Sequence, residues 1–136
     1  MDYWFDVSTP ADKAKIDLVK TELKLTTGTI TEVSLFHPEG CHGLAYAAIF
    51  IGGHQLYPSD PDNAYNGNAI PAIFKDHYEL KTPPVLTLKT WNLDDTYPHR
   101  VFVRITVLRP DEDPTLRATL DILSAIRSLL TGKRLS

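Results

Sequence analysis

Apolar and polar residues alternate with a period of two through most of residues 1–108. The alternation is clearest in residues 19–25 (VKTELKL) and 100–107 (RVFVRITV). A period of two is typical of a β-strand with one face in the core and the other in water. Shorter strand-like stretches lie at residues 3–7, 30–35, 54–57, 69–74, 77–80 and 86–91, separated by turn residues. The pattern predicts an all-β fold, an antiparallel β-sandwich or jelly roll of about eight strands.

Three details refine this β-pattern. Residues 44–51 (LAYAAIFI) form a nearly continuous apolar run, which predicts a central strand buried on both faces. Gly52-Gly53 after this run predicts a two-residue hairpin turn, and a change of apolar parity predicts a β-bulge near Thr31-Glu32. The residues expected to point into the core include Leu23, Leu25, Val33, Leu35, Ala47, Ile49, Ile51, Leu86, Leu88, Val103 and Ile105.

The period becomes helical after Pro110. Asp113 suits a helix N-cap and Pro114 the first helical position, and aliphatic residues then recur every three or four positions. These residues cover about half of a helical wheel, more than the ~100° stripe of a simple surface helix. Such a face either covers its own sandwich or contacts another chain, and the second is favoured because two sheets already fill their own core. The residues of this predicted interface are Leu116, Leu120, Ile122, Leu123, Ile126, Leu129 and Leu130.

Composition and charge limit the number of domains and the classes of partner that the chain can have. The chain of 136 residues has the size of one domain, with 43% hydrophobic residues and a net charge of −3. We expect a β-sandwich domain at residues 1–110 and a C-terminal helix and tail at residues 111–136. The longest basic cluster is Lys133-Arg134, which argues against a nucleic-acid partner. No signal peptide or membrane-spanning segment is recognisable, so we expect no membrane partner and a cytoplasmic origin.

Two segments contain residue types that bind metals in other proteins. Residues 37–42 (HPEGCH) combine His, Glu and Cys, but no second ligand pair follows at zinc-site spacing. This motif is therefore expected to form a tight turn shaped by Gly40 and Gly43. Residues 58–68 are rich in Asp and Asn but lack the spacing of an EF-hand loop, and such loops more often close through their own side chains. We expect neither a metal nor another cofactor.

No catalytic arrangement is recognisable in the sequence. A Gly-x-Ser-x-Gly motif is absent, and Cys41, the only cysteine, lies beside His42, where neighbouring side chains of an extended chain point apart. We therefore predict that the protein is not an enzyme. Aromatic residues at strand ends leave one alternative, a carbohydrate- or ligand-binding β-sandwich module. Its possible ligand loop contains Asp60, Asp62, Asn63, Trp91 and Tyr97.

The order of these features resembles a known group of proteins. A short N-terminal segment, about eight strands and a terminal helix are similar to the small jelly-roll proteins of tailed phages. The stretches that carry this resemblance are GLAYAAIFIGGHQLYPSDPD (residues 43–62) and TWNLDDTYPHRVFVRITVL (residues 90–108). Such proteins decorate capsids or build tail and spike parts. The resemblance implies a virion structural protein, made in the host cytoplasm, that acts through protein–protein interfaces as a homo-oligomer within a larger assembly.

Overall fold

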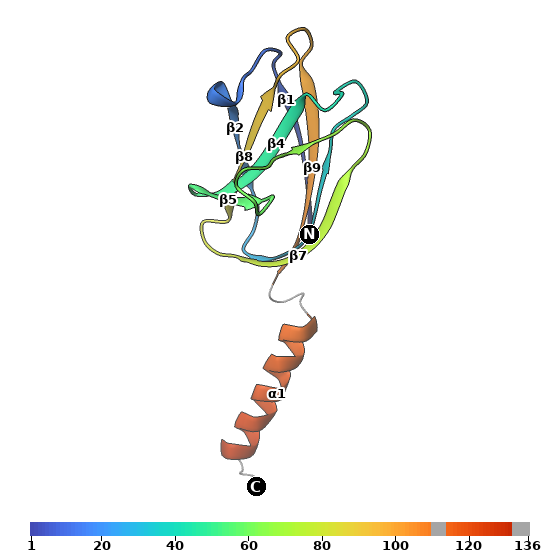
Figure 1. Cartoon of the computed structure of the whole chain (residues 1–136). Coiled ribbons are helices and arrows are strands. Elements are labelled where there is room, and N and C mark those ends of the chain that lie inside the picture. The colour runs from blue at the N-terminus through green and yellow to red at the C-terminus, as the bar shows by residue number, and fades with distance from the viewer. Residues whose placement is uncertain (110–113, 132–136) are drawn as a thin grey trace.

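A computed structural model of the chain describes residues 1–109 and 114–131. Within these ranges the chain forms nine strands, one short 3-10 turn and one α-helix (Figure 1). The elements are β1 (Asp2–Thr9), η1 (Lys15–Asp17), β2 (Val19–Lys24), β3 (Gly28–Phe36), β4 (Ala45–Ile51), β5 (His54–Tyr57), β6 (Tyr65–Asn66), β7 (Ala72–Leu80), β8 (Val85–Asn92), β9 (His99–Leu108) and α1 (Pro114–Thr131). The predicted all-β sandwich with a C-terminal helix is confirmed.

The strands pair in a nested order. One sheet has the order β1-β9-β3-β7, and the other has the order β2-β8-β4-β5 with the short strand β6 on β4. The pairs β1–β9, β2–β8, β3–β7 and β4–β5 are all antiparallel. The first long strand thus pairs with the last, and each following strand pairs with the next one inward. This is the order of a jelly roll, in which one long antiparallel ribbon is rolled up to form two facing sheets.

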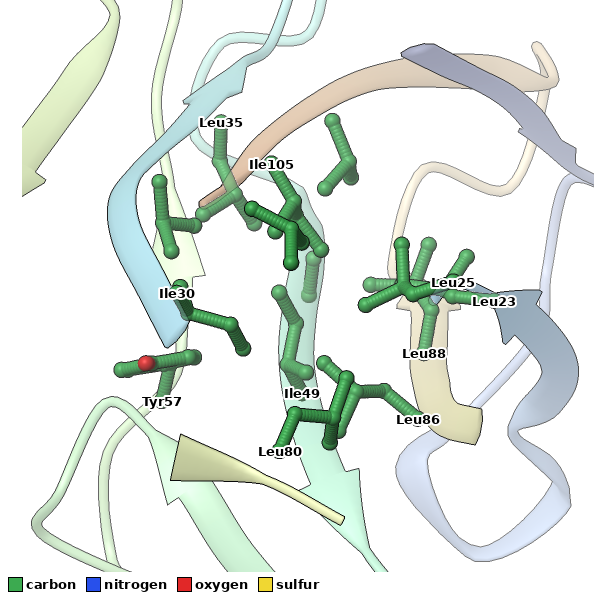
Figure 2. Packing of buried hydrophobic residues seen from close by; sticks show 14 of the residues in the cluster. Leu23, Leu25, Ile30, Leu35, Ile49, Tyr57, Leu80, Leu86, Leu88 and Ile105 are labelled. Atoms are coloured by element: carbon green, nitrogen blue, oxygen red, sulfur yellow. The ribbon is translucent and has the colours of Figure 1, made fainter. Parts of the chain in front are cut away.

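The two sheets enclose one hydrophobic core (Figure 2). Alternate residues of the central strands point into it, so Ile49, Leu88 and Ile105 are fully buried while their neighbours face outward. The predicted inward set is buried except for Ile51, which is half-buried at the end of β4. The buried members of that set are Leu23, Leu25, Val33, Leu35, Ala47, Ile49, Leu86, Leu88, Val103 and Ile105.

Strand β4 differs from the prediction of a strand buried on both faces. Its residues Tyr46 and Phe50 point away from the core and are only half-buried. Tyr46 stacks on Trp91 of β8, with ring centroids 5.4 Å apart, and Phe50 lies under the ammonium group of Lys89. The apolar run of residues 44–51 therefore reflects an aromatic patch on the outer face of the sheet as well as the core.

A bulge and a turn account for the remaining points at which the observed strands agree with or differ from the predicted ones. The register of β3 shifts between Ile30 and Glu32, which confirms the predicted bulge. The Gly52-Gly53 turn joins β4 to β5, as predicted. The two short strands predicted at residues 69–74 and 77–80 are in fact one strand, because β7 pairs with β3 on both sides of the bulge.

Helix α1 begins at Pro114, the residue predicted for the first helical position. The predicted N-cap Asp113 lies outside the described residues. Figure 1 shows α1 extending away from the sandwich beyond the end of β9. Among the described residues, no helix is long and apolar enough to cross a membrane.

Gly28 provides a test of the close packing between β3 and β9. Its φ is +154°, and a Cβ atom there would lie 2.6 Å from the Leu108 carbonyl oxygen and 3.0 Å from Val107 Cγ1. We expect Gly28→Ala to lower the free energy of unfolding by about 2 kcal/mol, because backbone must move to relieve the contact. Urea denaturation measures the change. Gly53→Ala is the control, since a Cβ atom at Gly53 would have no neighbour within 4 Å; equal effects of the two substitutions would contradict this account.

Candidate functional site

The candidate site is the aliphatic face of α1. The described side chains of the predicted interface are all exposed, with exposed fractions of 52% for Leu120, 60% for Ile122, 56% for Leu123, 47% for Ile126 and 83% for Leu129. Leu116 and Leu130 are helical, but their side chains lie outside those that the structure describes. At about 100° per residue, the five described side chains span about 180° of the helix circumference. The structure therefore places a broad, mainly aliphatic surface in solvent. By the same spacing, Thr119 and Arg127 also lie within this sector.

The opposite side of α1 is polar or small. Asp121, Ser124 and Ser128 lie there, together with Ala118 and Ala125. This division makes α1 amphipathic, and an amphipathic helix is normally stabilised by packing of its apolar face. In the chain as described, that face has no cover from the sandwich (Figure 1). A partner that covers it would remove a large aliphatic area from water.

A second group of titratable side chains lies where the β3–β4 and β8–β9 loops meet. His99 Nε2 lies 2.7 Å from Asp94 Oδ2, and both His37 and Cys41 are almost completely buried. Burial, followed by the charge of His99, lowers the pKa of His37 to about 4. Burial and then the charge of Asp94 raise the pKa of Cys41. At neutral pH, this end of the sandwich thus holds a neutral imidazole and a protonated thiol.

The predicted turn at residues 37–42 is confirmed by its geometry. Gly40 and Gly43 have φ values of +105° and +73°, which glycine adopts most easily. Asn68 Oδ1 accepts hydrogen bonds from the backbone N–H groups of Gly40 (2.7 Å) and His42 (3.1 Å). In the part of the chain that the structure describes, no group of three His, Cys, Asp or Glu side chains is arranged to hold a metal ion.

The five residues of the possible ligand loop do not line one common site. Asp60 accepts hydrogen bonds from the Asp62 N–H (3.0 Å) and Asn63 Nδ2 (2.6 Å), which closes the loop through its own side chains. Tyr97 is exposed in the β8–β9 loop. Asn63 and Trp91, in contrast, line one pocket together. Of the five residues, the pocket therefore includes Asn63 and Trp91 but not Asp60, Asp62 or Tyr97.

The rest of that pocket contains residues that the sequence did not single out. They come from η1, β4, β5 and β8, and include Lys15, Phe50, Gln55 and Lys89. These residues could be identified only from the register between strands, and the alternation within a single strand gives no information on that register.

A scan against models of protein families finds no match for this chain, and a search of curated proteins finds none either.

The buried His37 predicts a specific loss of stability in acid. Its pKa is about 4 in the folded chain and about 6.5 when unfolded, so the unfolded chain binds the extra proton first as the pH falls. Stability is complete above pH 6.5 and falls as the pH drops toward 4, with about 2 kcal/mol lost between pH 7 and about pH 4.5. Urea denaturation of wild type and His37→Asn at both pH values measures this loss.

The Asn variant should lose much less stability over that interval. His54→Asn, a change at an exposed histidine, should behave as wild type does. If His37→Asn lost as much stability in acid as wild type, the assignment to His37 would be wrong.

Proposed function

We propose that the protein is a non-enzymatic structural subunit that assembles with copies of itself through helix α1. The observation that carries this proposal is the row of exposed aliphatic side chains on the described part of the helix. Full burial of a Leu or Ile side chain contributes about 1.5–3 kcal/mol. The five side chains are about half-exposed or more, so covering them contributes roughly 5 kcal/mol for each helix before ordering costs.

The width of the aliphatic face favours several helices over two. A two-stranded coiled coil buries a narrow seam on each helix, whereas a helix in a bundle contacts two neighbours. The face of α1 covers about 180° of the circumference, and this width suits a bundle of three or more copies. The polar side with Asp121, Ser124 and Ser128 would then face water. The sandwiches would lie beyond one end of this bundle, because α1 extends away from its own sandwich (Figure 1).

A virion is the setting that we propose for this assembly. Jelly rolls are common in viral capsid proteins and in lectin domains, and the nested strand order of this chain is of that kind. A fold alone does not define a function. The support for an assembly role comes from the uncovered helix, and the support for the virion setting comes from the resemblance to small jelly-roll proteins of tailed phages.

A pair of double substitutions tests assembly through α1. Leu123→Asp with Ile126→Asp places two charges in the aliphatic face, and Ser124→Asp with Ser128→Asp places two charges on the opposite side. We expect wild type and the serine variant to form the same oligomer and the first variant to be monomeric, as measured by size-exclusion chromatography with light scattering. The β-sheet circular dichroism should be unchanged in both variants. A monomeric wild type, or a first variant with the wild-type oligomeric state, would refute the proposal.

Truncation tests whether the sandwich depends on the helix. Among the side chains that the structure describes, the buried core contains only residues of the strands and their loops, so a chain cut after residue 110 should remain folded. We expect it to unfold cooperatively in urea and to be monomeric. Loss of the cooperative transition would show that α1 contributes to the fold of its own domain and not only to assembly.

A further inference from the structure

We propose that the pocket between η1, β8, β4 and the loop after β5 binds a small hydroxylated carboxylate, of the size of one acidic sugar. The pocket has a volume of about 170 Å³. It lies on the outer face of the five-stranded sheet, because its strand residues Ala48, Phe50, Lys89 and Trp91 alternate with core residues. This site is independent of helix α1 and of the proposed assembly.

Two ammonium groups at the pocket have no carboxylate partner within the described part of the chain. Lys89 Nζ lies 3.9 Å from the centroid of the Phe50 ring, and Lys15 Nζ lies 5.4 Å from the centroid of the Trp91 ring. Neither lysine forms a salt bridge with any acid among residues 1–109 and 114–131. The cross-strand neighbour of Lys89 on β2 is another lysine, Lys20, and like charges in such positions are unfavourable. An anion between Lys15 and Lys89 would relieve this excess of positive charge.

Gln55 also lines this pocket, and its side-chain amide holds the loop after β5. Its Nε2 group donates to the carbonyl oxygens of Pro58, Asp60 and Asn63, each at 2.9 Å. Three carbonyl groups around one atom identify that atom as the amide nitrogen. The Oε1 atom accepts no hydrogen bond from the described residues, and Gln55 lines the pocket. The amide therefore holds the loop in place and leaves an acceptor for a hydroxyl group of a ligand.

The loop also removes its acidic groups from the pocket. Both carboxylate oxygens of Asp60 accept hydrogen bonds from within the loop, and neither Asp60 nor Asp62 lines the pocket. Leu18 and Pro61 add apolar wall. Two positive donors, one neutral acceptor and an apolar wall match a ligand with a carboxylate, a hydroxyl group and a carbon skeleton. The volume equals that of about six water molecules and suits a single ring.

Trp91 is a wall of this site and not a platform for stacking. Its ring is stacked on Tyr46 at an interplanar angle of 6°, and Lys15 lies over it. Only 8% of Trp91 is exposed, so a sugar ring cannot lie flat on the indole. Recognition by charge and hydrogen bonds predicts strong dependence on the carboxylate and on salt concentration.

Tryptophan fluorescence of the full chain tests the proposal. The chain contains two tryptophans, and Trp4→Phe removes the exposed one on the other sheet, so that Trp91 alone reports. We expect D-glucuronate to give a saturable change with a dissociation constant roughly in the millimolar range, as its size predicts. Glucose, which lacks the carboxylate, and cyclohexanecarboxylate, which lacks the hydroxyl groups, should each bind at least tenfold more weakly. Equal binding of either compound, or no saturable change with glucuronate, would overturn the proposal.

Lysine variants in the same background locate the site. Lys89→Met and Lys15→Met keep an apolar side chain and remove one charge each, and each should weaken glucuronate binding about tenfold. Lys24→Met is the matched control, because Lys24 is on β2 of the same sheet but does not line the pocket. Circular dichroism confirms that each variant is folded. If Lys24→Met weakened binding as much as Lys89→Met, the effect would be one of net charge and the pocket would not be the site.

Discussion

The structure depends on the pairing of its first strand with its last. Strand β1 lies antiparallel to β9 over its whole length, from Asp2 opposite Thr106 to Thr9 opposite His99. The N-terminal ammonium group donates a hydrogen bond to the Val107 carbonyl oxygen (2.6 Å), and the Val107 N–H donates to the Met1 carbonyl oxygen (2.8 Å). This pairing closes the rolled ribbon. It also brings the inward residues of both sheets into one core, since every other pair is nested inside it.

Much of this arrangement could be predicted from the sequence because the core follows local alternation. Leu86 and Leu88, or Val103 and Ile105, are two positions apart and face the same way in any strand. Phe50 could not be placed on the outer face in this way, because in an unbroken apolar run the inner and outer faces have the same composition. The single strand β7 was missed for a related reason: its continuity depends on a bulge in β3, a different strand.

The two surfaces with proposed roles differ in how far the sequence identifies them. The aliphatic face of α1 can be predicted from the helical spacing of its aliphatic residues. A helix places residues three and four positions apart on one face, whatever the rest of the chain does. The pocket lined by Lys15, Gln55 and Lys89 could not be predicted from the sequence. These residues come from η1, β5 and β8, and they meet only through the pairing of β8 with β2 and β4 and of β4 with β5. A sequence pattern therefore indicates local surfaces and misses those that the fold assembles.

The two ends of the sandwich differ in their side chains. One end is fixed by a buried, hydrogen-bonded amide, and the other leads to exposed aliphatic side chains. At the end where β9 begins, Asn92 is fully buried. Its Nδ2 donates to the Tyr97 carbonyl oxygen (2.9 Å), and its Oδ1 accepts from the Asp94 N–H (3.0 Å). A satisfied buried amide fixes its neighbours strongly, because breaking its hydrogen bonds leaves polar groups without partners. At the opposite end, β9 leads toward α1, whose described aliphatic side chains are exposed. A loop end fixed by this buried amide and exposed aliphatic side chains at the other end fit the role that we propose, a subunit that keeps its own shape and joins its neighbours through the helix.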